Sequence, residues 1–555
     1  MTLDGFLTVL ALLAAIYAVL PAVQRLRLGL AWKSQALLGI VAVAIILALE
    51  LYEMRPPACP SMFGDICRWL VLPEGDVGAS RKVAFLVAFG WLVLAVVIHN
   101  RSRPSLGSVP TFTQLAQELL DEEQFGEALK LLEPRMDLLA RASRRLCWQQ
   151  RLHDWLEEFG PTDPNSFTAL ARRPGYRRFS GETWPAWAAR PIRLLACVAP
   201  HYQRAESAAS DMLQMLFNSS KLLDYVAERR PYFGVALIRH QVYGAADFSE
   251  RFLSRLIASP GSALYHELAT NLVTDGPVAY ALPSRNRLLH FLFADARHAE
   301  QLSAWKGVGG YIERLLDGEE RPGYWTWLNG DQGWFEDEQY RDPIFMGMVF
   351  FDIMVRSAAH QNVLGHMWLY YLRHFARRLE AGYDSSGEGI DQEAEFPVRA
   401  ARLLYELAQI AKGWVGLFEN LPEDSIHRQF PPRRESPGSI PHAAALTLGD
   451  VLATVALSDR IDRGVAQTIN DVILRSIRDF HDDGAELSRM RIWLIQALLD
   501  GGSTADRRRY YNRLADLFAE TDHILRHEVE DYATELENRM NEADAASPYA
   551  IGAAR

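Results

Sequence analysis

The adjacent pair His481-Asp482 is the arrangement in this chain that comes closest to a metal-dependent active site. Such a pair can hold a divalent metal when a second histidine lies upstream and a carboxylate downstream, and the metal then activates water. The candidates are His442 upstream and Asp516 or Asp522 downstream. The local sequence favours a different interpretation, because Gly484 follows as a helix cap and a histidine near a helix C-terminus interacts favourably with the helix dipole. We therefore expect a helix end here, and the metal site stays an alternative.

Other catalytic spacings are incomplete. His266-Glu267 lacks a second histidine four positions after the first, as zinc-binding helices require, and His360, His366 and His374 do not share one helix face. The glycines at 307–310 are not followed by Lys-Ser/Thr, so they do not form a phosphate loop. No Gly-x-Ser-x-Gly elbow is present. The sequence does not point to an enzyme and predicts no cofactor.

Two clusters combine basic and aromatic residues. The first lies in a Pro- and Gly-containing stretch and consists of Arg172, Arg173, Arg177, Arg178, Trp184 and Trp187. Arginine and tryptophan suit the lipid interface, and arginine also binds phosphates. The second cluster is the run from Arg507 to Tyr511. The alternative is a solvated loop for the first cluster and, for the second, an ordinary helix face with arginine stems packed on tyrosine. We expect the first to be a binding surface.

The segment 323–354 is dense in aromatic residues, including Tyr324, Trp325, Trp327 and Phe350. Such residues are common at binding surfaces. They are also common in the core of a large helical domain. We favour the core, with a ligand groove as the alternative.

Three apolar stretches occupy the first hundred residues, at about 6–23, 36–52 and 83–98. Each is long enough, or nearly so, to cross the ~30 Å hydrocarbon layer as a helix. Glu50 and Glu53 lie at the end of the second stretch. We expect residues 1–103 to be a membrane anchor with three transmembrane helices and these two carboxylates to reach the interface.

The loops of the anchor predict its orientation. Basic residues follow the first and third stretches, which places those loops in the cytoplasm, although the second loop also contains basic residues. Cys59 and Cys67 lie in that second loop, where an oxidising compartment would allow a disulfide. We therefore predict an N-terminus outside and a large C-terminal domain in the cytoplasm, in the inner membrane of a bacterium. Two free thiols in a cytosolic loop are the alternative.

The chain has 555 residues and a formal net charge of −11. Phosphate backbones require a basic face, so nucleic acid is not an expected partner. The expected partners are the lipid bilayer, another protein and, as an open alternative, further copies of this chain.

Nearly all of the remaining chain reads as helix, because apolar residues return every three or four positions among Ala, Leu, Arg and Glu. We expect amphipathic helices at 211–232 and 243–257, and two more within 285–316 that are split by the glycines at 306–310. Breaks containing Pro and Gly divide the chain. The expected parts are a hairpin region at 104–160, a helical domain at 161–395, a C-terminal helical domain at 396–542 and a mobile tail at 543–555.

One stretch, residues 112–141, has a recognisable pattern. Its apolar and small positions are Phe112, Leu115, Ala116, Leu119, Phe125, Ala128 and Leu132. This spacing resembles the helix–turn–helix of a tetratricopeptide repeat. Glu123 departs from the pattern where the turn usually has glycine, as does Arg135 where a small residue is usual. The resemblance implies an α-solenoid-like surface that binds other proteins.

These observations predict an all-α protein in which three transmembrane helices precede a large α-solenoid-like domain. The function expected first is that of a membrane-tethered interaction or sensor protein. The second is an oligomeric membrane effector or channel, for which Glu50 and Glu53 would line a shared axis. The third is a metal phosphohydrolase built on His442, His481 and Asp482.

Overall fold

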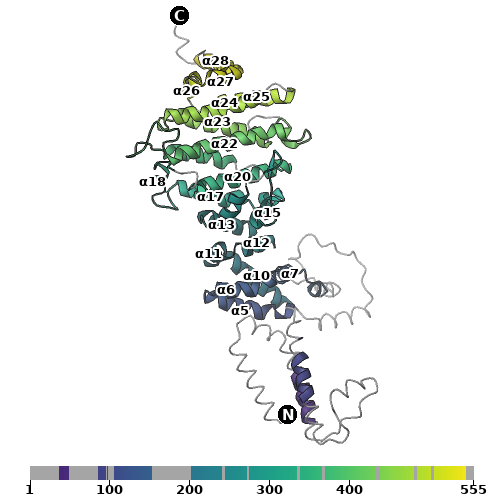
Figure 1. Cartoon of the computed structure of the whole chain (residues 1–555). Helices are drawn as coiled ribbons and strands as arrows, with labels where there is room; N and C mark the ends of the chain where they lie inside the picture. Colours follow the sequence, from purple (N-terminus) through teal and green to yellow (C-terminus); the bar gives the residue numbers. More distant parts are fainter. Residues whose placement is uncertain are drawn as a thin grey trace, which may run out of the picture. The chain divides into compact units, whose positions relative to one another are not determined.

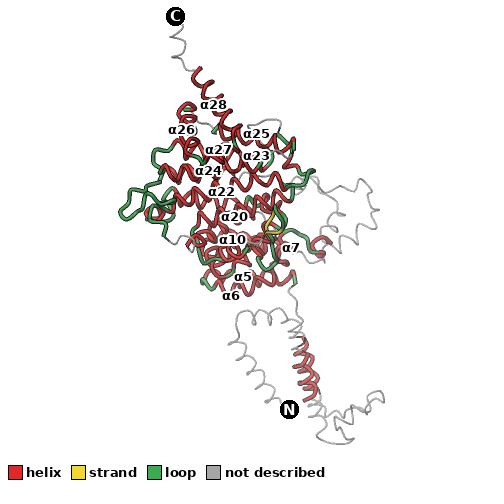
Figure 2. The backbone as a smooth tube through the Cα atoms, turned by 45° about the horizontal axis from the view of Figure 1, so that its top comes forward, coloured by secondary structure: helices red, strands yellow, loops and turns green. Residues whose placement is uncertain are grey.

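The computed structural model of this protein describes residues 37–48, 85–94, 97, 105–152, 202–240, 244–271, 274–333, 338–364, 369–431, 438–480, 484–501 and 506–545. Helices account for nearly all of its regular structure (Figure 2), so the prediction of an all-α protein is confirmed. Within the described part, the one sheet is a hairpin of β1 (Thr274–Asp275) and β2 (Ala279–Tyr280). The chain divides into two compact units, Met1–Leu222 and Leu223–Arg555.

Two apolar helices lie within the second and third predicted spans, while the first, 6–23, falls outside the described residues. The helices are Leu37–Ala48 and Phe85–Leu94. Ile46 packs against Val87 and Ala88. Gly39 lies beside Trp91, so the two helices run antiparallel. We call them the apolar helix pair. Their described lengths, 12 and 10 residues, give about 18 and 15 Å, which is shorter than a full span.

The other described residues of the first unit form a small helical assembly. It contains η2 (Leu106–Ser108), α5 (Val109–Asp121), α6 (Phe125–Leu132), η3 (Glu133–Arg135), α7 (Met136–Ser143) and α10 (Gln203–Asn218). Helix α5 packs against α6 and α10, and α10 packs against α7. Ala116 and Ala128 are fully buried in this assembly. Glu123 joins α5 to α6 with φ +58°, a left-handed conformation for which glycine would be the usual residue.

Helix α11 (Ser220–Arg229) leads into the second unit, whose helices follow one another in chain order (Figure 1). Its first half contains α12 (Pro231–Arg239), α13 (Ala245–Ala258), α14 (Ala263–Thr270), α15 (Arg287–Phe293), α16 (Ala296–Gln301), α17 (Ala304–Leu316), α18 (Tyr324–Leu328) and η5 (Gln339–Arg341). Helix α13 packs against α12 and α17. Prolines lie in the first turn of α12 and of two later helices. The first turn tolerates proline because the N–H groups there have no acceptor within the helix.

The second half of this unit continues the same succession. It contains α20 (Pro343–His360), α21 (Leu369–Ala381), α22 (Arg399–Asn420), η6 (Ile426–Arg428), α23 (Ile440–Leu457), α24 (Arg463–Asp479), α25 (Ala485–Asp500), α26 (Arg507–Glu520), α27 (His523–Glu528) and α28 (Glu530–Ala545). Each long helix contacts others that are near it in sequence: α20 packs on α22, α22 on α23 and α24, and α26 on α28. Most contacts of this half therefore join helices that lie close together in the sequence.

Helix α23 forms the centre of the C-terminal half. It contacts α21, α22, α24, α25 and α26. Among the described helices it alone has the length and apolar composition needed to cross a membrane, but 83% of that segment is buried inside the protein. We therefore interpret α23 as a core helix.

The expected helix break at 306–310 is wrong, because α17 runs through it without interruption. The glycines permit close packing. A Cβ added to Gly307 would lie 2.5 Å from the carbonyl oxygen of Glu250 on α13. One added to Gly309 would lie 2.6 Å from the ring of Tyr371. Tertiary contacts thus outweigh the weak helix propensity of glycine.

Candidate functional site

Most of the sequence candidates lie outside the described residues. These are His481 and Asp482 of the metal hypothesis, the cluster Arg172, Arg173, Arg177, Arg178, Trp184 and Trp187, and the cysteine pair Cys59 and Cys67. Each therefore stays a prediction from sequence.

His442 is described and lies in the core. Its side chain is fully buried in the first turn of α23, where Nδ1 pairs with the hydroxyl of Ser439. The rings of Phe430 and Trp493 pack edge-on against it, with centroids 4.7 and 4.9 Å away. Burial, aided by the positive charge of Arg489, lowers the pKa of His442 to about 4. This histidine is therefore neutral at physiological pH and is held in an aromatic environment.

Asp516 and Asp522, the downstream metal candidates, are solvent-exposed. Asp522 accepts the backbone N–H of Ile524 and so caps α27. Within the described ranges, no three His, Cys, Asp or Glu side chains are close enough to hold a metal ion. The described residues thus offer no set of ligands around His442.

The second basic–aromatic cluster is a helix face. Tyr510 and Tyr511 on α26 are buried, and the Tyr510 hydroxyl donates to the carbonyl of Leu498 at 2.7 Å. Arg509 pairs with Asp459 at 2.7 Å and Arg508 pairs with Asp544 at 3.1 Å. The tyrosines stabilise the core while the arginines form surface ion pairs, as the alternative interpretation expected.

The aromatic segment also contributes to the core. Helix α20 is buried along nearly its whole length, including Phe350 and Phe351. The fully buried hydroxyl of Tyr324 donates to Asp342 at 2.5 Å. The same carboxylate caps α20 by accepting the N–H of Phe345 at 2.8 Å. Burial raises the pKa of Asp342 to about 6, although these hydrogen bonds oppose the rise.

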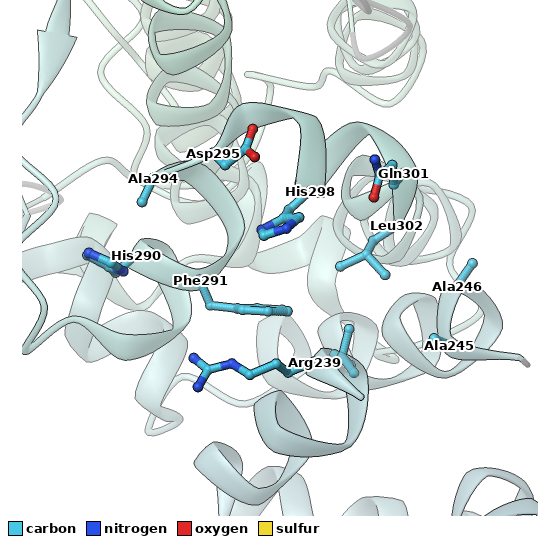
Figure 3. Close-up of a pocket in the computed structure, with 11 residues that line it drawn as sticks. Arg239, Ala245, Ala246, His290, Phe291, Ala294, Asp295, His298, Gln301 and Leu302 are labelled. Atoms are coloured by element: carbon cyan, nitrogen blue, oxygen red, sulfur yellow. The ribbon is translucent and has the colours of Figure 1, made fainter. Parts of the chain in front are cut away.

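The described residues form an open groove of about 710 Å³ between α12, α13, α15 and α16 (Figure 3). We call it the α12–α16 groove. Its size lies within the range of small-molecule sites, about 300–1,000 Å³. Its lining is Ile238, Arg239, Ala245, Ala246, His290, Phe291, Ala294, Asp295, His298, Gln301 and Leu302.

A three-layer stack stands at one side of the groove. The Phe291 ring lies between the Arg239 guanidinium, 5.7 Å from its centroid, and the His298 ring, also 5.7 Å away and tilted by 28°. Figure 3 shows this order, with Asp295 on the His298 side of the stack. Stacking orients the guanidinium plane and leaves its N–H groups at the edges available.

Side chains from other helices hold α15 at both ends. Glu267 of α14 is buried and accepts the backbone N–H groups of Leu288 and Leu289 at 2.9 and 3.0 Å. At the other end Gln361 donates to the carbonyl of Phe293 and accepts the N–H of Ala296, at 2.9 and 2.8 Å. The wall of the groove is therefore preorganised by groups outside it.

The charged residues that line the groove differ in whether a neighbouring group compensates their charge. Asp295 caps α16 by accepting the N–H of Arg297 at 3.1 Å, so part of its charge is already compensated. Arg239 is exposed, and among the described residues no carboxylate pairs with it. Arg239 is thus the cation that the groove offers to a ligand.

Sequence reasoning missed this groove. Its residues come from four helices and span positions 238–302, and no two of them form a recognisable motif. The only local indications were the pair His266-Glu267, which holds α15 through Glu267, and the aromatic–basic composition of 287–298.

Comparison with known proteins gives no match. No family model matches the chain, and neither the curated proteins nor the solved structures contain a significant relative. The resemblance of residues 112–141 to a tetratricopeptide repeat therefore stays a prediction from its spacing.

Proposed function

We propose that this chain is a membrane-tethered helical protein that binds a partner protein through its α-solenoid-like domain. The observation that carries the proposal is the combination of an apolar helix pair with a long succession of helices. Fold alone does not define function, so the partner and its site must be found by experiment.

The apolar helix pair supports the tether. Large apolar side chains cover its surface: Leu37 and Ile40 are 64% and 67% exposed, and Phe85 and Phe89 are 59% and 57% exposed. Exposed apolar surface of this density is costly in water and favourable in hydrocarbon. The antiparallel pairing of the two helices is the arrangement of two successive membrane crossings. The proposal includes full membrane crossings at 36–52 and 83–98, together with one at 6–23.

The succession of helices from α12 to α28 supports the binding role. Solenoid-like arrangements expose long surfaces that other proteins bind, and many contacts of this unit join helices that are near each other in the chain. The proposed location of this domain is the cytoplasm, as the loop charges and Cys59 and Cys67 suggest.

Purification of the full-length protein from its native membrane in mild detergent tests the proposal. We expect a monomer or dimer that carries a stoichiometric second protein. A closed homo-oligomer without a partner would contradict it and favour the oligomeric effector, for which ion flux would be the next assay. Labelling of Cys59 in intact cells only after reduction would support the proposed orientation.

A further inference from the structure

We propose that the α12–α16 groove binds a small organic anion with an apolar body. This inference rests on the proposed function, since it gives the tethered domain a ligand to sense. Arg239 receives the anionic group, and the apolar lining receives the body.

The anion is inferred from the partners of the charged lining residues. The guanidinium of Arg239 lies over Phe291 from an exposed position, and no carboxylate of the described residues pairs with it. A guanidinium binds carboxylate, sulfonate or phosphate oxygens with two parallel hydrogen bonds. Asp295 opposes an anion, but its carboxylate is engaged at the N-terminus of α16 and lies on the far side of Phe291 and His298 (Figure 3).

The apolar body is inferred from the remaining lining. Leu302 is partly exposed and provides aliphatic surface, whereas Ile238 is 3% exposed and contributes little. The three alanines 245, 246 and 294 leave room rather than fill it. The volume of about 710 Å³ suits a ligand of drug-like size. Because Glu267 and Gln361 hold α15 at both ends, little ordering of this wall is needed on binding.

Calorimetric titration of the full-length protein in mild detergent with 2-naphthalenesulfonate tests the inference, with detergent alone as the reference. This probe combines an aromatic body with a permanent anion. We expect saturable binding at one site. The affinity for the neutral analogue 2-naphthalenemethanol should be weaker by a factor of roughly ten or more. Absence of saturable binding, or equal affinity for both probes, would overturn the inference.

Variants locate the site. Arg239→Met should weaken sulfonate binding by about tenfold or more. Arg297→Met, which removes an exposed arginine of α16 outside the lining, should leave it unchanged. Ala246→Phe places a ring in the groove from an exposed position and should abolish binding without disturbing the core. Equal affinities for the Arg239 and Arg297 variants would overturn the inference.

Failure of this inference is distinguishable from failure of the proposed function. Membrane retention and the co-purifying partner should be the same for Arg239→Met and for the unaltered chain. Loss of the partner from that variant, with sulfonate binding unchanged, would show that the groove is a protein contact and would overturn the small-anion assignment.

Discussion

The helices of the apolar helix pair and α23 are all rich in apolar residues, but their surroundings are opposite. On Leu37–Ala48 and Phe85–Leu94 many large apolar side chains are exposed, whereas α23 is enclosed by five other helices. Where α23 carries polar groups, protein atoms satisfy them: Asp450 pairs with Arg373 at 2.9 Å, and His442 with Ser439. Hydropathy therefore identifies an apolar helix, but the groups around it decide between protein core and lipid.

The largest expected effect comes from placing a charge in α23. Val451 is fully buried, so Val451→Asp would bury an unpaired carboxylate and should destabilise the domain by about 4 kcal/mol or more. Thermal unfolding of the full-length protein in mild detergent, followed by circular dichroism, measures this. An unchanged midpoint would mean that α23 is not a core helix.

The next largest expected effect is a dependence of the protein's stability on pH, which arises from the buried His442 of α23. The pKa of His442 is about 4 in the folded protein, against about 6.5 in an unfolded chain. Between these values the unfolded chain binds more protons, so stability falls as the pH decreases from about 6.5 to about 4, by about 3 kcal/mol in total. His442→Asn should flatten this dependence in unfolding measurements across that range.

Asp342 makes stability depend on pH in the direction opposite to His442, so its variant serves as the control. Its pKa is raised to about 6 in the folded protein, so the folded state binds more protons and gains stability as the pH falls through 6. Asp342→Asn should therefore make the loss of stability at acidic pH steeper. Identical profiles for the two variants and the unaltered protein would contradict both assignments.

A smaller effect tests how closely α23 packs. A Cβ on Gly449 would clash with the carbonyl oxygen of Ala497 on α25, so Gly449→Ala should destabilise the domain by about 1–3 kcal/mol. Gly416→Ala on α22 is the matched control, because nothing lies within 4 Å of the added atom. It should stabilise slightly, since alanine is the better helix former. Urea unfolding of both variants measures the difference, and equal effects would contradict the close contact.

The smallest expected change in domain stability comes from the apolar helix pair. Ile40→Asp alters an exposed side chain, so unfolding of the helical domain should change by less than about 0.5 kcal/mol. The same substitution should weaken retention in the membrane, because a charge in hydrocarbon costs about 2.5–3.5 kcal/mol on insertion scales. Carbonate extraction of membranes measures this retention. A large loss of domain stability would instead place Ile40 in a protein core.

Periodicity in the sequence was sufficient to predict the helical class, because buried positions such as Leu404, Leu407 and Ala411 recur at helical spacing. It failed at Gly307 and Gly309, where the reason for glycine is a neighbouring helix that the sequence does not place nearby. The groove could not be predicted for the same reason. Arg239, Phe291 and His298 meet only after α12, α15 and α16 have packed together.

Photolabelling tests most directly whether lipid surrounds the apolar helix pair and protein surrounds α23. The full-length protein in liposomes is labelled with a diazirine reagent dissolved in the bilayer, and the adducts are mapped by mass spectrometry. We predict adducts within Leu37–Ala48 and Phe85–Leu94 and none within Ile440–Leu457. Adducts in α23, or an unlabelled apolar helix pair, would contradict the account that lipid surrounds the pair and protein surrounds α23.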